Sequence, residues 1–200
     1  MNLSPLAETA GLLLAGGRSR RFGAEKAVAR FRGRALMDCV AERLSQCALI
    51  AVGARPESAA AQLAHEHGWP VLHDEPRFPQ GPLAGVYAGL QWAKRNGLER
   101  LATAPCDAPL LPAGLFETLL SALGAASAAY AATDEGDHAL CAVWRTRLLA
   151  PLGAELGSMS HPRVCDFLRR HGAVTTHFSD EAAFANANTL ACLHALGGAA

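Results

Sequence analysis

Short apolar runs alternate along the first 125 residues with stretches in which apolar residues recur every three or four positions. A short continuous apolar run fits a strand buried on both faces, and the wider spacing fits an amphipathic helix. We therefore expect strands at 11–15, 48–52, 71–72 and 101–104, and helices at about 35–46, 57–67, 82–96 and 112–123. Beyond residue 125 the pattern is mixed, and we expect strands at 139–144 and 173–177 and a short helix at 163–170.

This alternation of strand and helix predicts the α/β class, as a Rossmann-like three-layer α/β/α sandwich with a mostly parallel sheet. A chain of 200 residues is long enough to bury its own core, so we expect a single domain. In such sheets a ligand binds beyond the carboxyl ends of the strands. The loops expected at that edge are 16–26, 53–56, 73–81 and 105–109.

Charge and composition reduce the range of functions that the chain can have. The chain has 18 Lys and Arg against 18 Asp and Glu, which argues against binding to nucleic acid or a membrane surface through bulk charge. No apolar run approaches the roughly 20 residues of a membrane span, and no basic segment precedes the first apolar run as in a signal peptide. The six cysteines fit no zinc spacing and read as reduced thiols. We therefore expect a cytoplasmic protein with no nucleic-acid or membrane partner.

The segment 14–26, LAGGRSRRFGAEK, directly follows the first apolar run and is the most informative part of the chain. Gly16 and Gly17 allow backbone N–H groups to approach an anion closely, because no Cβ blocks the way. Their spacing matches neither a Walker A loop nor Gly-x-Gly-x-x-Gly. The segment predicts a polyphosphate site, with a solvated basic turn as the alternative. Four cations stand within nine residues: Arg18, Arg20, Arg21 and Lys26.

Asp107 stands between Pro105 and Pro109, just after the strand expected at 101–104. The prolines restrict the backbone and hold the carboxylate at the edge of the sheet. Because Mg²⁺ needs only one or two protein carboxylates when phosphates supply further oxygens, Asp107 is a candidate metal ligand. The alternative is a cap on the next helix or turn.

Asn186 and Asn188 alternate near the end of the chain, so their side chains share a face if the segment is extended. That arrangement suits polar contacts to phosphate, to a metal or to a pterin. The alternative is a turn in which each asparagine bonds to its own backbone.

Residues 14–26 resemble the signature of sugar-nucleotide-type nucleotidyltransferases, and the chain as a whole resembles the molybdenum cofactor guanylyltransferases, the MobA family. Glu25 stands where that family often has Asp. The loop after the second expected strand lacks the family's usual Asn, which leaves base recognition to backbone groups or to Arg55. Four further segments agree in the same order: GPLAG at 81–85, PCDAPLLP at 105–112, HALCAVWR at 138–145 and FANANT at 184–189.

The resemblance implies transfer of GMP from GTP to the terminal phosphate of molybdopterin, with Mg²⁺ as the cofactor and pyrophosphate as the leaving group. It also implies a fold of the nucleotide-diphospho-sugar transferase type, with residues 1–125 as a nucleotide-binding half and 126–200 as an acceptor half. The catalytic residues so implied are Lys26, Arg21 and Asp107, and Asp107 is also the metal ligand. Asn186 and Asn188 fall on the acceptor and phosphate side. The nucleotide-binding residues so implied are Leu14, Ala15, Gly16, Gly17, Lys26, Asp74, Gly81 and Asp107.

Gly17 favours a guanine nucleotide by resemblance, because relatives that use CTP tend to read Leu-Ala-Ala-Gly at these positions. A molybdopterin cytidylyltransferase and a sugar-phosphate nucleotidyltransferase remain alternatives. So does a catalytically silent GTP-binding protein that delivers the cofactor to a molybdoenzyme. The expected protein partner is a molybdoenzyme or a cofactor-delivery protein.

Overall fold

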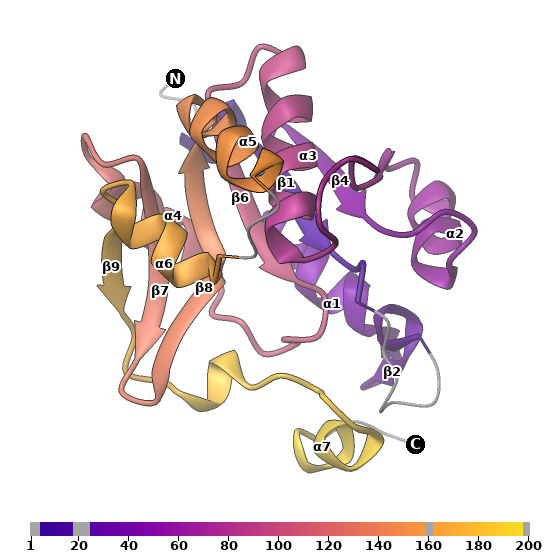
Figure 1. Ribbon diagram of the computed structural model, residues 1–200. Coiled ribbons are helices and arrows are strands. Elements are labelled where there is room, and N and C mark those ends of the chain that lie inside the picture. The colour runs from indigo at the N-terminus through magenta and orange to yellow at the C-terminus, as the bar shows by residue number, and fades with distance from the viewer. Residues whose placement is uncertain (1–4, 18–24, 159–161, 198–200) are drawn as a thin grey trace.

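Within residues 5–17, 25–158 and 162–197, which are those that the structure describes, seven strands form one central sheet. Strand β8 runs antiparallel to both of its neighbours, whereas the other pairings are parallel. The predicted α/β class with a mostly parallel sheet is confirmed. The order in the computed structural model (Figure 1) is β5 (Val71–Leu72), β4 (Leu49–Gly53), β1 (Thr9–Leu14), β6 (Arg100–Pro105), β8 (Gly136–Arg145), β7 (Ala128–Thr133) and β9 (Val174–His177).

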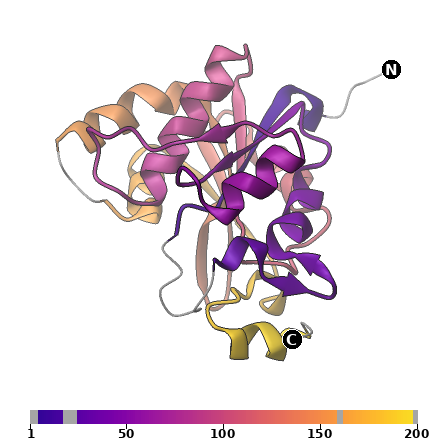
Figure 2. The ribbon, with the colours of Figure 1, turned by 90° about the vertical axis from the view of Figure 1, so that its right-hand side faces the viewer.

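Helices cover both faces of the sheet, which gives the predicted three layers. Figure 2 shows α3 (Pro82–Arg95) and α5 (Leu149–Gly157) on one side of the sheet and α1 (Leu36–Ala41) on the other. Strand β1 packs against helices on both sides, because Leu13 lies in the cluster that contains α1 and Leu12 in the cluster that contains α3 and α5. This is the burial that a continuous apolar run predicts. One face carries α1 (Leu36–Ala41), α2 (Ala59–Glu66) and α4 (Leu115–Leu123), and the other carries α3 (Pro82–Arg95), α5 (Leu149–Gly157) and α6 (Val164–Arg170).

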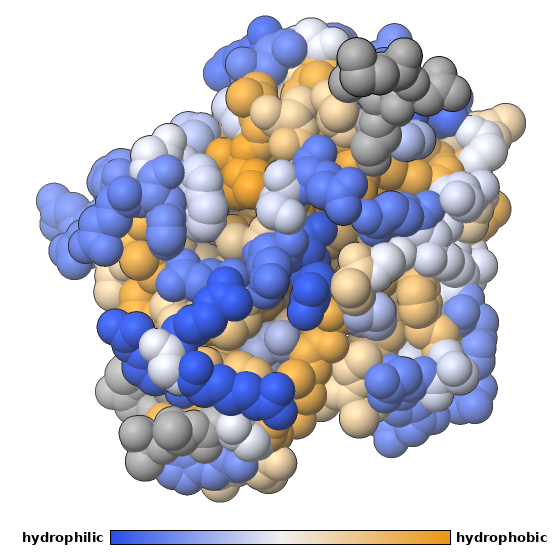
Figure 3. Space-filling view, turned by 180° about the vertical axis from the view of Figure 1, so that it is seen from behind, coloured by the Kyte–Doolittle hydropathy of each residue, from blue (hydrophilic) through white to orange (hydrophobic). Residues whose placement is uncertain are grey.

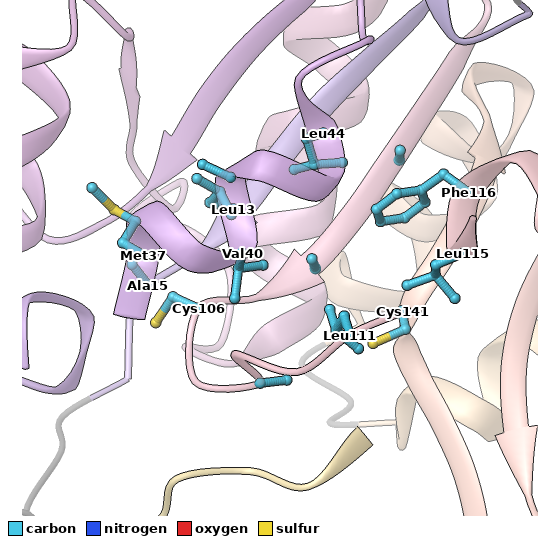
Figure 4. Packing of buried hydrophobic residues seen from close by; sticks show 14 of the residues in the cluster. Leu13, Ala15, Met37, Val40, Leu44, Cys106, Leu111, Leu115, Phe116 and Cys141 are labelled. Atoms are coloured by element: carbon cyan, nitrogen blue, oxygen red, sulfur yellow. The ribbon is translucent and has the colours of Figure 1, made fainter. Parts of the chain in front are cut away.

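The core beneath α1 and α4 follows directly from the sequence pattern (Figure 4). Met37, Val40 and Leu44 recur at intervals of three and four residues and form one apolar stripe. This stripe belongs to the same cluster as Leu13 of β1 and Phe116 of α4, and all five side chains are completely buried. The strand and the two helices are therefore held together by hydrophobic contacts.

Two expected helices differ in extent from the observed ones. The helix expected at 35–46 is α-helical only in α1 and continues as the 3-10 turn Glu42–Leu44. Ser45 closes it, because its hydroxyl donates to the carbonyl oxygen of Glu42 at 2.8 Å. Helix α4 begins at Leu115 because the chain from Pro112 forms a turn, in which the Leu115 amide donates to the Pro112 carbonyl at 3.2 Å.

The C-terminal segment crosses from β9 back to the start of the chain. In Figure 1 it runs beneath the carboxyl ends of the strands and reaches α7 (Leu190–Ala195), near the small hairpin of β2 (Arg30–Phe31) and β3 (Arg34–Ala35). Ala187 and Leu193 are buried there against Phe31, Leu36 and Cys39. This apolar cluster holds residues from the two ends of the sequence against each other.

The view from behind shows a band of hydrophilic residues that crosses hydrophobic ones (Figure 3). Among the described residues, no helix is both long enough and apolar enough to cross a membrane.

Replacing Gly89 by alanine is expected to lower the free energy of unfolding by about 1–3 kcal/mol. Gly89 faces the sheet from the middle of α3, and a Cβ there would lie 2.5 Å from Leu12 Cδ2 and 2.9 Å from Leu101 Cδ2. Urea denaturation measures the effect. Gly157→Ala is the matched control, because among the described residues its Cβ would meet only Phe78, at 4.0 Å. Equal stability of the two variants would contradict close packing of α3.

Candidate active site

Four loops leave the carboxyl edge of the sheet side by side, as the sequence predicts. The strands that carry them stay hydrogen-bonded to one another up to their last residues. Each loop therefore begins one strand spacing from the next, and side chains distant in sequence can meet above the edge. The terminal bonds run from Ala54 N to Leu72 O (3.1 Å), from Ala15 N to Gly53 O (2.8 Å) and from Cys106 N to Leu14 O (3.2 Å).

The glycine turn after β1 presents its backbone to solvent. Leu14 is half-buried and Ala15 is buried, whereas Gly16 and Gly17 are both exposed. A Cβ on Gly16 would lie 3.9 Å from the carbonyl oxygen of Gly53, and one on Gly17 would meet no atom of the described residues within 4 Å. The described residues therefore leave the space above this turn open to a ligand. Arg21, with Arg18 and Arg20, lies outside the described residues.

Lys26, Asp107 and Asn188 meet at this edge although they are far apart in sequence. The Lys26 ammonium donates to Asp107 Oδ2 at 2.9 Å and to Asn188 Oδ1 at 2.8 Å. The side chains of Lys26 and Asp107 are 17% and 20% exposed, so the pair is largely enclosed but still reachable from solvent. A carboxylate and an amide oxygen therefore converge on one cationic group.

A backbone bond fixes the place of the C-terminal asparagines. The Ala187 amide donates to the Asp107 carbonyl oxygen at 2.8 Å, and the Ala187 side chain is buried. Asn186 and Asn188 on either side are exposed. The segment is not a plain extended strand, because the Asn188 amide donates to the Asn186 carbonyl at 2.9 Å. Asn188 reaches the lysine from this tight turn.

Asp74 and Gly81 border the same edge on its β5 side. A Cβ on Gly85 of α3 would lie 3.0 Å from Leu14 Cδ2 and 3.7 Å from Asp74 Oδ1. Leu14 and Asp74 therefore both lie against the first turns of α3. Gly81 directly precedes α3 in an extended conformation. Burial by neighbouring atoms raises the pKa of the Asp74 carboxyl, and His73 partly opposes this shift.

A divalent ion at this edge would need oxygen ligands from a substrate. Among the described residues, no group of three or more His, Cys, Asp or Glu side chains could hold a metal. The Asp107 carboxylate and the Asn188 amide oxygen already face one cation. Two such hard oxygen donors fit an ion whose remaining ligands are phosphate oxygens and water.

Two buried thiols lie beside Asp107. Cys106 precedes it, and Cys141 comes from a bulged part of β8. Burial, together with the Asp107 charge, raises the pKa of each thiol to about 12. The six cysteines all fall within the described residues, and each is a free thiol.

We expect Cys192 to react with a disulfide reagent at pH 8 while Cys106 and Cys141 stay unmodified in the folded protein. The thiolate is the reactive form. Cys192 is exposed, and a hydrogen bond from the Thr189 hydroxyl lowers its pKa, opposite in direction to the shift of the buried pair. Peptide mapping after a timed reaction shows which of these cysteines is labelled first, and Cys192→Ser is the control. Labelling of Cys106 as fast as Cys192 would contradict the site's enclosure.

Glu25 directly precedes Lys26, and the sequence alone predicts no role for it. Its carboxylate accepts hydrogen bonds from the Ala59 and Ala60 amides at 2.7 and 3.2 Å, at the start of α2. The available signal was an acidic residue directly before Lys26, but sequence spacing does not reveal a partner more than 30 residues away.

His138 of β8 stacks on Phe184, with ring centroids 4.5 Å apart. Burial lowers the pKa of His138, although Asp137 and Glu135 oppose the shift. The residues implied for nucleotide and acceptor thus border a common edge, as far as they are described.

The chain matches a family model described as the MobA-like NTP transferase domain over residues 11–174. It is 42% identical over 181 residues to a molybdenum cofactor guanylyltransferase of Cereibacter sphaeroides, which covers 89% of this chain and 90% of that protein. It is 38% identical over 200 residues to one from Burkholderia ambifaria, covering 94% and 95%.

Among solved structures, the fold is similar to that of molybdopterin-guanine dinucleotide biosynthesis protein A from Archaeoglobus fulgidus. The TM-score is 0.76 at 22% identity, and the similarity covers 94% of this chain and 96% of the other. That likeness concerns the fold, whereas the family model and the two relatives agree over most of the sequence. The chain therefore belongs to the MobA-like NTP transferase family.

Proposed function

We propose that the protein transfers GMP from GTP to the terminal phosphate of molybdopterin and releases pyrophosphate. The observation that carries this proposal is the meeting of Lys26 and Asp107 beside the open glycine turn. A cation, a carboxylate and exposed backbone amides together suit a polyphosphate with a divalent ion. Relatives named molybdenum cofactor guanylyltransferase support the same substrates.

The reaction exchanges one phosphoanhydride bond for another. An oxygen of the acceptor phosphate bonds to the α-phosphorus of GTP, and the bond from that phosphorus to the α–β bridging oxygen breaks, so that this oxygen leaves with pyrophosphate. The acceptor phosphate is already ionised at neutral pH, so no side-chain base has to remove a proton. The protein's task is then to align two anions and offset their charge.

The proposed site residues share this task. Lys26 offsets charge that builds on the pyrophosphate, together with Arg21, and the amides of Gly16 and Gly17 donate to phosphate oxygens. Asp107, with substrate phosphates, would hold Mg²⁺, which when bound offsets phosphate charge as a Lewis acid. Asn188 and Asn186 face the acceptor phosphate. The remaining nucleotide contacts fall to Leu14, Ala15, Asp74 and Gly81.

Each of the two parts of the chain binds one substrate. Residues up to about 125 carry the glycine turn, Lys26, Asp74 and Asp107, and bind GTP. Residues 126–200 carry the acceptor side, including both asparagines. Guanine is favoured over cytosine by the glycine at position 17, and base contacts come from backbone groups or Arg55 at the exposed loop after β4.

The direct test supplies the protein with molybdopterin, Mg²⁺ and each of the four nucleoside triphosphates in turn, and measures pyrophosphate. We expect release with GTP that depends on molybdopterin. Release only with CTP would indicate a cytidylyltransferase, and release with a hexose 1-phosphate in place of molybdopterin would indicate a sugar-phosphate enzyme. GTP binding without pyrophosphate would indicate a silent delivery protein.

The product has to reach a molybdenum enzyme, so we include in the proposal a molybdoenzyme or a cofactor-delivery protein as partner. A cytoplasmic location belongs to the same proposal, because GTP is a cytoplasmic substrate and free thiols are typical of that compartment.

A further inference from the structure

The start of α2 is capped by a residue from outside its own segment. An α-helix begins with amide groups that have no partner within the helix. Here the Ser58 hydroxyl accepts from the Ala61 amide at 3.2 Å, as an ordinary N-cap does. The Ala59 and Ala60 amides instead donate to the two carboxylate oxygens of Glu25. One carboxylate thus serves two amides of the first turn.

Glu25 is also tied to the lysine that follows it. Its carbonyl oxygen accepts from the Val28 amide at 3.3 Å and so closes the 3-10 turn Lys26–Val28. Consecutive Cα atoms are about 3.8 Å apart, so fixing Glu25 leaves the Lys26 backbone little freedom. Side chain and main chain of this one residue therefore join the lysine turn to a helix of the scaffold.

The charge of Glu25 suits this role. The N-terminus of α2 carries partial positive charge from its oriented peptide groups, which a carboxylate stabilises. Hydrogen bonds that involve an ionised acceptor are stronger than neutral ones. A neutral amide in place of the carboxylate can accept with one atom only, and its NH₂ group would face a donor.

We infer that Glu25 is a positioning residue, which holds Lys26 at the place where its ammonium meets Asp107, Asn188 and the substrate phosphates. This inference rests on the proposed function for its catalytic consequence, but its structural part concerns the substrate-free protein. Misplacing a charged group by about 1 Å can cost on the order of 100-fold in rate. For loss of Glu25 we expect a smaller effect, about tenfold in kcat, because the Asp107 and Asn188 contacts remain.

The experiment compares Glu25→Ala with Ser58→Ala, a matched control. Both variants remove a cap from the first turn of α2, and both are expected to lower Tm by about 2–4 °C. Only the first acts on the residue next to Lys26. We expect kcat for GMP transfer to fall about tenfold in Glu25→Ala and to stay within twofold of the native value in Ser58→Ala. Glu25→Gln, which keeps one acceptor, should lie between them.

A spectroscopic readout needs no substrate. The chain has two lysines, Lys26 and Lys94, so ¹⁵N-lysine labelling gives two backbone amide signals, which Lys94→Arg assigns. We expect the heteronuclear NOE of the Lys26 amide to drop in Glu25→Ala and to be unchanged in Ser58→Ala, with Lys94 as the internal reference. An unchanged Lys26 NOE in Glu25→Ala and Glu25→Gln overturns the inference, as do equal kcat losses in the two alanine variants.

The experiments distinguish failure of the proposed function from failure of this inference. If the native protein makes no product from GTP and molybdopterin, the function fails, while the NOE comparison still decides whether Glu25 holds Lys26 in place.

Discussion

Replacing Asp107 by asparagine is expected to lower kcat for GMP transfer by about 100-fold or more, because the site loses the charge that holds a divalent ion against the phosphates. Asparagine keeps the size of the side chain and an oxygen that can accept from Lys26, 2.9 Å away in the native protein. The bond from Ala187 involves only the main chain of residue 107 and should survive. Steady-state kinetics at increasing Mg²⁺ measure the effect, and high Mg²⁺ should restore part of the rate.

Asp38→Asn is the control for this variant. Asp38 is a partly buried carboxylate that accepts from His67, on the α1 and α2 side of the sheet. Its replacement removes the same charge from the chain without touching the carboxyl edge. A native rate with native Mg²⁺ dependence in Asp107→Asn would mean that this carboxylate does not hold the ion.

Replacing Lys26 by alanine is expected to lower kcat/KM for GTP by about 100-fold, since the phosphates lose a cation and Asp107 loses its partner. Lys26→Arg should recover part of the loss because it retains the charge, although its planar group cannot reproduce both contacts of the ammonium. Initial rates of pyrophosphate release over a range of GTP concentrations separate the effects on kcat and KM.

Lys94→Ala is the matched control, because Lys94 is the other lysine of the chain and lies exposed in the last turn of α3. Protection from an amine-modifying reagent gives a second measurement. GTP with Mg²⁺ should shield Lys26 and leave Lys94 reactive. Equal protection of the two lysines, or normal kinetics in Lys26→Ala, would contradict the assigned role.

Much of the nucleotide side of the fold could be predicted because its signals are local. Apolar runs such as 48–52 and helical spacing such as that of Leu36, Val40 and Leu44 give the element type directly. The carboxyl-edge rule for parallel sheets then places the loops, and the structure puts them side by side.

Strand β7 and helix α5 were not predicted, because the residues of each are atypical of the element that they form. Strand β7 reads AAYAAT, and four of its six residues are alanine, which has low strand propensity. Pairing on both sides with β8 and β9, together with complete burial, overrides that propensity. Helix α5 contains Pro151 and Gly153, which usually mark a break, yet Pro151 falls in the first turn, where proline is tolerated. Gly153 allows close contact with Tyr87, only 2.9 Å from a Cβ placed there.

The contacts that assemble the site lie beyond local patterns. Asn188 reaches Lys26 across 162 positions of sequence, because the C-terminal segment returns beneath the sheet and packs through Ala187. The bond between Glu25 and α2 likewise joins segments 34 residues apart. Sequence alone indicated which residue types gather at the edge, and the three-dimensional fold indicates which of them touch.

The most direct test of the account is calorimetric titration of GTP into the native protein and into Asp107→Asn, each with Mg²⁺ and with EDTA. The account predicts one GTP bound per chain, with affinity at least about tenfold weaker in EDTA for the native protein and nearly the same in both conditions for the variant. Absence of heat with GTP when Mg²⁺ is plentiful would contradict it, as would an undiminished Mg²⁺ dependence in Asp107→Asn.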